Sequence, residues 1–270
     1  MKNKGYYINI ISFVILSIFF MSCGGEEDSI PLPDVPRTAA DVREDFSNLT
    51  FNVGINDVIL ESLVEGLFWK FRVIVPESAS SSNKLPLVMR LHGGASAASA
   101  DAHKSTDCLV SPGFEAIDTY IISPNSSGSL WYDEPNIVQV LALLDMAKEN
   151  FHIDKDKVVV MGYSDGGNGS WFFAQFYSSL FSAAISMASS YDTNNTSAGI
   201  QPFAIPLYVI HGSEDTLFPL EITQGYVNAS IDVGSDIQFE TANGLGHFEP
   251  CEYVLFLRDA VSWLETEVWN

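Results

Sequence analysis

Positively charged residues are scarce in this sequence. The 270 residues include 13 lysines and arginines against 34 aspartates and glutamates, which gives a formal net charge of −21. Because a protein that binds nucleic acid needs basic patches to neutralise phosphates, no nucleic-acid partner is expected. An anionic membrane surface would repel the chain too. We interpret the acidic excess as a solvated surface rather than as a specific site.

The sequence also lacks the usual motifs of metal and dinucleotide sites. There is no H-E-x-x-H, no paired C-x-x-C, and no G-x-G-x-x-G after a strand-like run. No internal repeat is visible either. We therefore expect neither a metal nor an organic cofactor. Because 47% of the residues are hydrophobic, a chain of this length can bury the core of one large α/β domain or two small ones.

Cysteine is rare, and the first of the three cysteines follows an apolar N-terminal run. Lys2 and Lys4 precede this run, which extends from Tyr6 to Phe20 and is too short for an ordinary spanning helix. It ends in "FMSC" at Cys23 and resembles a bacterial lipoprotein signal, in which the cysteine is lipidated and becomes the first residue of the mature chain. An ordinary secretory signal cut nearby is the alternative.

Three segments are expected along the chain. Residues 1–22 are interpreted as the signal peptide, 23–45 as an acidic and proline-rich tether, and 46–270 as the folded domain. The acidic run "GGEEDS" after the cysteine resembles the surface-export tags of some Gram-negative lipoproteins, and a plain solvated tether is the alternative. We therefore expect an exported outer-membrane lipoprotein, exposed at the cell surface if the run is a tag. It would contact the membrane only through its lipid anchor.

Strand-like runs and helical patterns alternate through the folded segment. Several runs are apolar throughout, as expected of strands that are covered on both faces in a parallel sheet. The expected strands are 68–76, 85–94, 119–125, 157–164, 182–189, 205–215 and 236–244. The expected helices are 137–151, 168–180, 220–233 and 252–269, the first with an apolar face of Val138, Leu141, Ala142, Met146 and Phe151.

This alternation predicts an α/β fold, namely a doubly wound, mostly parallel sheet of about eight strands with helices on both faces. Ligands in such folds bind beyond the C-terminal ends of the strands. Only residues 189–203 separate two of the expected strands at the place where a lid could be inserted. We therefore expect little or no cap domain and an open site.

Ser164 lies directly after a strand-like stretch, in "VVVMGYSDGG". Gly162, Ser164 and Gly166 match G-x-S-x-G, in which the serine occupies a strained strand-to-helix turn and flanking side chains would clash. The match alone would arise by chance about one time in ten in a chain of this length. The strand before it and the helix after it favour a catalytic nucleophile over a serine in an ordinary tight turn.

A histidine and an acid follow Ser164 in the order that such a site requires. Of the five histidines, only His247 lies late enough to follow an acid in the last strand-exit loops. Asp215 comes directly after the strand-like run 206–210 and could orient the base by accepting a hydrogen bond from its Nδ1–H. Glu214 is the near alternative for the acid, and His211 is interpreted as structural.

An oxyanion hole needs backbone N–H donors that are fixed before the reaction. One is expected from Asp165, the residue after the nucleophile. The other is expected from the glycine pair of "LHGGAS", with Gly94 as the donor and Ala95 as the near alternative. A carboxylate that faced the site would disfavour the oxyanion, so the Asp165 side chain is expected to point away.

Four motifs in this order, "LHGG", "GYSDGG", "HGSEDTLFP" and "GLGHF", resemble the α/β-hydrolase superfamily over about residues 50–270. More narrowly, the chain is similar to feruloyl and acetyl-xylan esterases, polyhydroxybutyrate-depolymerase-like esterases, and the phospholipase/carboxylesterase group. The resemblance implies that Ser164 is the nucleophile, His247 the base and Asp215 the acid. These motifs are specific for the superfamily and indicate little about the substrate.

Two further sets of residues have expected roles near the site. Trp131, Tyr132 and Phe218 lie at strand exits and could stack on a sugar ring or an aryl acyl group, with loop packing as the alternative for each. The resemblance places the first and last helices on one face of the sheet, so a disulfide between Cys108 and Cys251 is feasible and would steady the His247 loop. Two free thiols are the alternative.

Together these features predict a serine esterase that cleaves carboxylic esters through an acyl-enzyme. By analogy alone, the substrate would be an acetylated or feruloylated polysaccharide or oligosaccharide. One alternative is a serine peptidase of the prolyl-oligopeptidase type, although no propeller domain precedes the hydrolase-like segment. The other is a non-catalytic carbohydrate-binding lipoprotein on a hydrolase scaffold, which would have no need of a complete triad.

Overall fold

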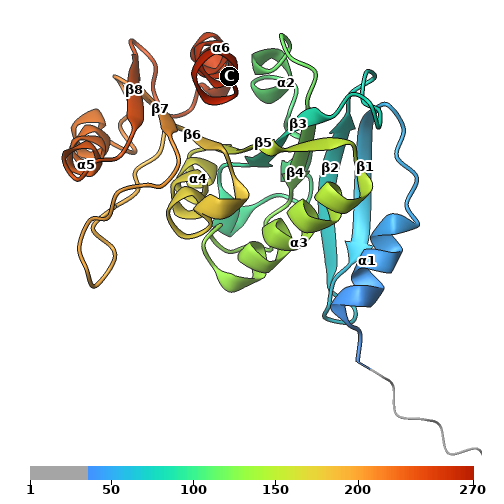
Figure 1. The fold of residues 1–270 in the computed structure, drawn as a ribbon. Helices are drawn as coiled ribbons and strands as arrows, with labels where there is room; N and C mark the ends of the chain where they lie inside the picture. Colours follow the sequence, from blue (N-terminus) through green and yellow to red (C-terminus); the bar gives the residue numbers. More distant parts are fainter. Residues whose placement is uncertain (1–35) are drawn as a thin grey trace, which may run out of the picture. The chain divides into compact units, whose positions relative to one another are not determined.

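The fold is built on an eight-stranded sheet, seen in a computed structural model that describes residues 36–270 (Figure 1). The sheet order is β1-β2-β4-β3-β5-β6-β7-β8, and only β2 is antiparallel to its neighbours. The strands are β1 Gly54–Glu61, β2 Phe68–Val75, β3 Leu85–Leu91, β4 Tyr120–Pro124, β5 Ile153–Tyr163, β6 Ala183–Met187, β7 Leu207–Gly212 and β8 Ile237–Ala242. The predicted mostly parallel sheet is therefore confirmed.

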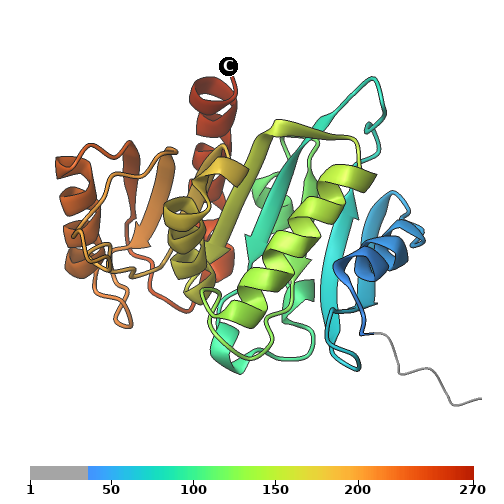
Figure 2. The same ribbon diagram turned by 60° about the horizontal axis from the view of Figure 1, so that its bottom comes forward.

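Helices cover the sheet on both faces (Figures 1 and 2). The short α2 and the C-terminal α6 lie on one face, and α1, α3, α4 and α5 lie on the other. Their bounds are α1 Ala39–Ser47, α2 Val110–Gly113, α3 Glu134–Asn150, α4 Asp165–Phe176, α5 Leu220–Asp232 and α6 Val254–Trp263. The doubly wound arrangement follows from the alternation of strands and helices along the chain.

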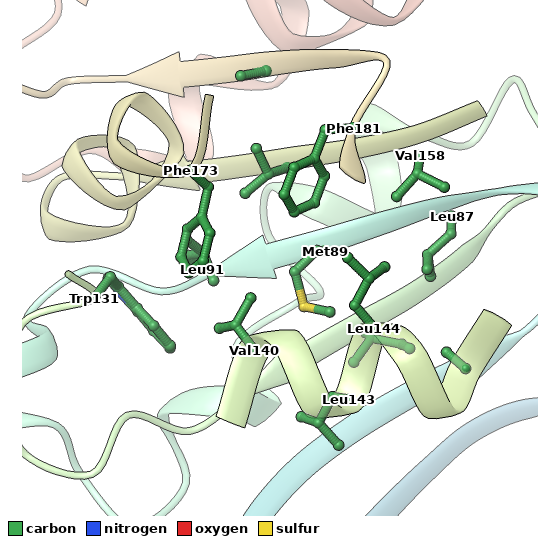
Figure 3. Close-up of a cluster of buried hydrophobic side chains, with 14 of the residues drawn as sticks. Leu87, Met89, Leu91, Trp131, Val140, Leu143, Leu144, Val158, Phe173 and Phe181 are labelled. Atoms are coloured by element: carbon green, nitrogen blue, oxygen red, sulfur yellow. The ribbon is translucent and has the colours of Figure 1, made fainter. Parts of the chain in front are cut away.

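Two hydrophobic cores, one on each face, explain why the central strands are apolar throughout. In β5, Val158 and Val160 belong to the core under α3 and α4, whereas Val159 and Met161 belong to the core under α6. Figure 3 shows the first core, where Leu144 from α3 packs over the sheet. Because successive side chains of a strand point to opposite faces, a strand that is covered twice shows no polar alternation.

The start of the folded unit differs from the sequence prediction, which assigned residues 23–45 to a tether. Residues 39–47 instead form α1, and Thr38 caps this helix through a reciprocal pair of hydrogen bonds with Asp41. Val42 and Phe46 on α1 are 3% and 1% exposed. The boundary near residue 45 is therefore wrong, because a short capped helix buries its apolar side chains on the sheet.

Besides α1, two further elements, β1 and α2, were not among the predicted ranges. The edge strand β1 has one face that is only partly covered, and Asn56 and Asp57 interrupt its apolar residues. Such a strand gives a weaker signal than a central strand. The other element, α2, is a single turn of four residues, too short to show a helical period.

The predicted helix 137–151 corresponds to α3, and its buried face agrees with the prediction at Met146 but not at Val138. Val138 is 38% exposed, whereas Val140, Leu143 and Ala147 are fully buried. The buried stripe also contains Asn136, whose side chain accepts a hydrogen bond from the Ser127 N–H and donates to the Ser129 carbonyl. The buried face of a helix is predicted from the positions of its apolar residues. That prediction fails where a polar residue is buried with its hydrogen bonds satisfied inside the fold.

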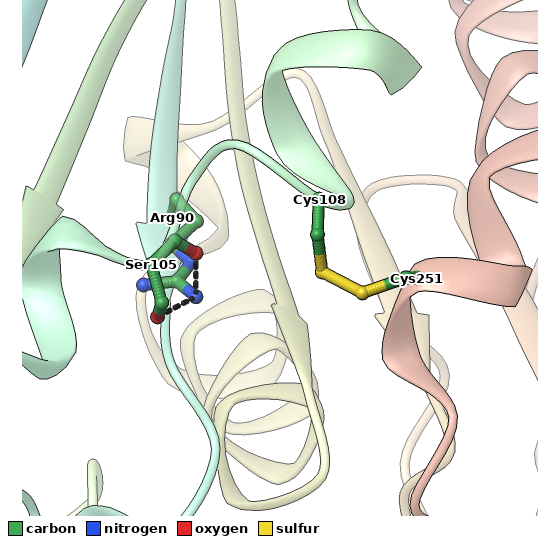
Figure 4. Close-up of a disulfide and its surroundings, with 4 residues drawn as sticks. All are labelled: Arg90, Ser105, Cys108 and Cys251. Atoms are coloured by element: carbon green, nitrogen blue, oxygen red, sulfur yellow. Dashed lines mark hydrogen bonds between the residues drawn. A yellow bond between two sulfur atoms is a disulfide. The ribbon is translucent and has the colours of Figure 1, made fainter.

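A disulfide joins Cys108 to Cys251, the pair that the sequence left open (Figure 4). Their Cα atoms are 4.9 Å apart. Cys108 lies just before α2, and Cys251 lies in the short turn Pro250–Tyr253 that leads into α6. The bond therefore ties the two helices of one face together, close in sequence to His247.

The connection between β6 and β7 is a loop without a helical cap. The loop between these strands, residues 188–206, contains no helix, which agrees with the expectation of little or no cap. Within the part of the chain that the structure describes, no helix combines the length and the apolar character needed to cross a bilayer.

Candidate active site

Ser164 occupies the sharp turn between β5 and α4. Its backbone has φ 58° and ψ −124°, a strained conformation for a residue with a side chain. The Ser164 N–H donates to the carbonyl of Met187 on β6 at 2.9 Å, which fixes the turn. A Cβ atom on Gly166 would collide with the Leu91 carbonyl of β3, and one on Gly162 would collide with Gly166 itself. The glycines of the motif are therefore required by close packing.

The structure brings the three predicted catalytic side chains into one hydrogen-bonded chain. The Ser164 hydroxyl lies 2.8 Å from Nε2 of His247, and Nδ1 of His247 lies 2.8 Å from Oδ2 of Asp215. His247 and Asp215 are each 5% exposed. In the tautomer that this geometry favours, Nδ1–H donates to Asp215 and Nε2 accepts from the serine. This is the arrangement of a serine-hydrolase triad, while the predicted alternative, Glu214, is exposed to solvent.

Backbone donors hold the Asp215 carboxylate in place. Its second oxygen, Oδ1, accepts hydrogen bonds from the N–H groups of Leu217 and Phe218 at 2.9 and 2.8 Å. His211 lies beneath the same turn and donates from Nε2 to the Phe218 carbonyl at 2.7 Å. Burial lowers the pKa of His211, so this ring is neutral and its 3.6 Å approach to Asp215 is not an ion pair. The contact agrees with the structural interpretation of His211.

Two tyrosines, not predicted from the sequence, position the loop that carries His247. The Tyr163 hydroxyl donates to the His247 carbonyl at 2.8 Å, and the Tyr253 hydroxyl donates to the Gly246 carbonyl at 2.9 Å. Burial raises the pKa of Tyr163 well above its usual range and that of Tyr253 to about 12, so both remain donors at neutral pH. The position of Tyr163 next to Ser164 could have pointed to its role from the sequence, whereas nothing in the sequence pointed to Tyr253.

The loop after β3 lies against the nucleophile, as an oxyanion hole requires. A Cβ atom on Gly93 would approach the Ser164 Cβ to 3.2 Å, and Gly94 has a left-handed φ of 62°. The Ala95 N–H donates to the carboxylate of Asp165 at 2.9 Å, so Ala95 is not a free donor. Gly94 and the Asp165 N–H, in the first turn of α4, remain the predicted donors.

The contact with Ala95 shows what the Asp165 side chain binds. Its carboxylate is bonded to the backbone of the loop that borders the nucleophile, and that it points away from the oxyanion stays a prediction. The negative charge is therefore partly neutralised by a backbone dipole. A carboxylate in this place acts as a hydrogen-bond acceptor for the oxyanion loop.

Trp131 is not a substrate contact, in contrast to the prediction. Its side chain is 0% exposed, and Nε1–H donates to the His92 carbonyl at 2.8 Å. The indole packs edge-on against the His92 ring, whose Nδ1–H donates to the Gly93 carbonyl. Burial lowers the pKa of His92 to about 4 and keeps it neutral, so that Nε2 accepts from the Ser126 N–H. Trp131 and His92 thus support the oxyanion loop from below.

The other two predicted contacts, Tyr132 and Phe218, do reach the surface near the triad. Tyr132 is 38% exposed, and the partial burial of its hydroxyl, together with the charge of the nearby Asp165, raises its pKa. Phe218 is partly buried and packs edge-on against the His247 ring at 5.0 Å. Phe248, which is 76% exposed, packs against the same ring at 5.3 Å. Their contact with substrate stays a prediction.

Among residues 36–270, no group of three or more His, Cys, Asp or Glu side chains is arranged to hold a metal ion. The chemistry of the site can be described with the side chains and backbone donors already named. Ser164 supplies a nucleophile, His247 a base that touches it, and the loop after β3 a place for an oxyanion.

Comparisons with known proteins agree with this geometry. Residues 127–205 match the model described as the prolyl oligopeptidase family. The comparison with curated proteins gives no significant match.

Among solved structures, a thermostable esterase has a TM-score of 0.62 at 18% identity, covering 78% of this chain and 62% of its own. The fluorophosphonate-binding serine hydrolase F of Staphylococcus aureus has a TM-score of 0.65 at 17% identity, covering 79% and 99%. A truncated carbohydrate esterase from gut microbiota has a TM-score of 0.60 at 16% identity, covering 74% and 91%.

The structural matches establish the fold. The chain spans less than two thirds of the thermostable esterase, and the family model covers only the part from the end of β4 to the loop after β6. The eight-stranded sheet, the strained serine after β5 and the order serine, aspartate, histidine are the features expected of an α/β-hydrolase fold. The chain therefore has the α/β-hydrolase fold.

Proposed function

We propose that this protein is a serine esterase that hydrolyses carboxylic esters through an acyl-enzyme, and that its substrates are acetyl or feruloyl esters of polysaccharides or oligosaccharides. The continuous hydrogen-bonded chain from Ser164 through His247 to Asp215 carries the proposal. A serine held at 2.8 Å from an imidazole that is itself oriented by a buried carboxylate is poised to lose its proton.

The proposed reaction follows two steps. Ser164 attacks the ester carbonyl while His247 accepts its proton, and Asp215 stabilises the imidazolium that forms. The N–H groups of Gly94 and Asp165 stabilise the tetrahedral oxyanion, a contribution of about 3 kcal/mol for each donor. His247 then gives the proton to the leaving alcohol, and the acyl-enzyme is formed. A water molecule, deprotonated by His247, releases the acid and restores Ser164.

The open edge of the sheet supports a bulky or polymer-attached ester. The loop 188–206 contains no helix that could close over Ser164. The exposed Phe248 packs against the His247 ring, the exposed Tyr132 lies near Asp165, and both offer flat apolar surfaces. The fold likeness to a carbohydrate esterase from gut microbiota is consistent with this substrate class.

A serine peptidase of the prolyl-oligopeptidase type is the second candidate. The match of residues 127–205 to that family model favours it. The two candidates use the same triad and differ in the leaving group, which is an amine for a peptidase and an alcohol for an esterase. Residues 36–270 form one compact unit, so within this range no second folded unit could exclude all but short peptides from the site.

Hydrolysis of p-nitrophenyl acetate, methyl ferulate and succinyl-Gly-Pro-p-nitroanilide by the purified protein tests the proposal. Wild type is expected to cleave both esters and to be far slower on the anilide. Ser164→Ala should lower kcat by about a millionfold, as the loss of a triad nucleophile does. Ser81→Ala, which removes an exposed serine before β3, is the matched control. Absence of ester cleavage by wild type, or activity that survives Ser164→Ala, contradicts the proposal.

Export as a lipoprotein modified at Cys23 is part of the same proposal. Residues 1–22 and 23–35 lie outside the described residues, so the argument rests on the sequence motif. The disulfide between Cys108 and Cys251 supports an oxidising compartment, since such bonds are rare in the cytosol. Labelling of the full chain with an azido fatty acid, and loss of the label in Cys23→Ser, is the expected result. Labelling that persists in Cys23→Ser would exclude this anchor.

A further inference from the structure

A groove of about 390 Å³ runs along α4, beginning next to the nucleophile turn. Asn168, Phe172 and Phe176 lie four residues apart and form one stripe along the helix. The opposite wall comes from the loop after β6, with Tyr191, and Tyr132 lies at the end nearest Asp165. Because α4 starts at the residue after Ser164, the groove residues on this helix lie about one to three turns from the nucleophile.

The walls of this groove combine aromatic faces with polar side chains. Phe176 is 50% exposed and Tyr132 is 38% exposed, so both rings present apolar surface to solvent. Asn195 and Asp192 also line the groove. An alkyl chain bound here would remove water from the carboxylate of Asp192, and the lining has no cation to pair with it. A ligand that offers both apolar faces and hydroxyl groups matches the lining.

The polar wall is held rigid before any ligand arrives. The Tyr191 hydroxyl donates to the Gln175 side chain at 2.9 Å, and the Asn195 amide donates to Tyr191 at 2.8 Å. The Tyr191 ring stacks on the buried Trp171 with an interplanar angle of 10°. The Ser190 N–H donates to the Asn168 side chain at 2.9 Å, which ties the loop to α4. Little conformational freedom is therefore lost when a ligand binds.

The charge of the groove restricts the ligand further. Its lining includes the carboxylate of Asp192 and no lysine, arginine or histidine. The carboxylate of Asp165 lies near Tyr132 and adds to the negative potential. A uronic-acid polymer would be repelled, whereas an uncharged sugar would not.

We propose that this groove binds neutral sugar residues of the ester's alcohol portion, stacking them on Phe176 and Tyr132 and bonding their hydroxyls to Asn195 and Asp192. This inference rests on the proposed esterase function and specifies the substrate class of that site. The sugar that carries the acyl group lies at Ser164, and its neighbours in the chain occupy the groove along α4.

Binding without turnover is the first test. Ser164→Ala, checked for folding by circular dichroism, is titrated calorimetrically with xylohexaose, cellohexaose and hexagalacturonate. At least one neutral hexasaccharide is expected to bind, and adding Phe176→Ala should weaken that binding about five- to tenfold, the loss of one aromatic contact. Leu255→Ala, a 66% exposed residue on α6, is the control and should change nothing. Absence of neutral binding, no effect of Phe176→Ala, or equal affinity for hexagalacturonate overturns the inference.

Turnover separates this inference from the esterase proposal. The ratio of kcat/KM for acetylated xylooligosaccharide to kcat/KM for p-nitrophenyl acetate should fall about five- to tenfold in Phe176→Ala. If wild type cleaves esters and the ratio does not change, the groove assignment is wrong and the esterase stands. If no ester is cleaved but the neutral hexasaccharide still binds to Ser164→Ala and binding depends on Phe176, the esterase proposal fails and the groove stands.

Discussion

The carboxylate of Asp165 accepts a hydrogen bond of 2.9 Å from the backbone N–H of Ala95. The two residues are 70 positions apart in the sequence, and they meet because β3 and β5 are neighbours in the sheet. The bond links the residue after the nucleophile to the loop that carries Gly94. It therefore fixes the distance between the two predicted oxyanion donors.

Loss of this link should lower kcat. Asp165→Ala removes the acceptor and frees the Ala95 N–H, and we expect kcat to fall about ten- to a hundredfold with KM almost unchanged, less than the loss of a whole donor. Asp165→Asn keeps an acceptor oxygen and should retain most of the activity. Steady-state kinetics on p-nitrophenyl acetate decide the matter. Equal losses in the two variants would mean that the charge, and not the hydrogen bond, is what matters.

Trp131→Phe distinguishes a supporting role from a substrate contact. The change removes the Nε1–H that donates to the His92 carbonyl and leaves a small cavity, so the free energy of unfolding should fall by about 1–3 kcal/mol. We expect kcat to fall while KM is unchanged, because the oxyanion loop loses its support. Urea unfolding and kinetics are the measurements. A raised KM with unchanged stability would restore Trp131 as a contact.

Removal of the disulfide should destabilise the fold and loosen the His247 loop. The bond closes a loop of 143 residues, and in the chain-entropy account such a bond contributes about 3–5 kcal/mol. Cys108→Ser/Cys251→Ser should therefore unfold at a lower temperature and show a lower kcat. Thermal unfolding of wild type with and without dithiothreitol provides the matched comparison. Identical melting curves for the double variant and the oxidised wild type would contradict the expectation.

The buried His92 should make stability depend on pH. Burial, together with the charges of Arg90 and His103, lowers its pKa from 6.5 to about 4. Between these values the unfolded chain binds more protons than the folded chain, so stability is full above pH 6.5 and falls as the pH drops toward 4. The loss expected from this group alone is about 3 kcal/mol.

The measurement for His92 is urea unfolding at pH 7 and pH 4.5, in wild type and in His92→Gln. Burial also lowers the pKa values of His103 and His211, and these act in the same direction in both proteins. The change in the free energy of unfolding between pH 7 and pH 4.5 therefore differs between the two proteins only by the contribution of His92. An equal change in both proteins would show that the ring is not buried in its neutral form.

Much of the fold followed from local patterns. The central strand β5 was visible because both faces of "VVVMG" are buried, and the strand end at Ser164 was visible because its flanking glycines permit close packing. The edge strand β1 and the helix α1 were missed, since one is only partly covered and the other lies in a segment with tether-like composition. Burial against the sheet, and not propensity, made them regular.

The sequence by itself determined the sheet, the nucleophile turn and the order of Ser164, Asp215 and His247, because each depends on residue types at short spacing or on chain order. Only the tertiary structure decided that Asp165 bonds to Ala95, that Cys108 meets Cys251 and that Trp131 is buried. These contacts join residues far apart in the chain. In addition, the sequence does not show whether a given tryptophan is buried or exposed. The packing of strands and helices brings each of these residues next to its contacts, and those contacts determine what its side chain does.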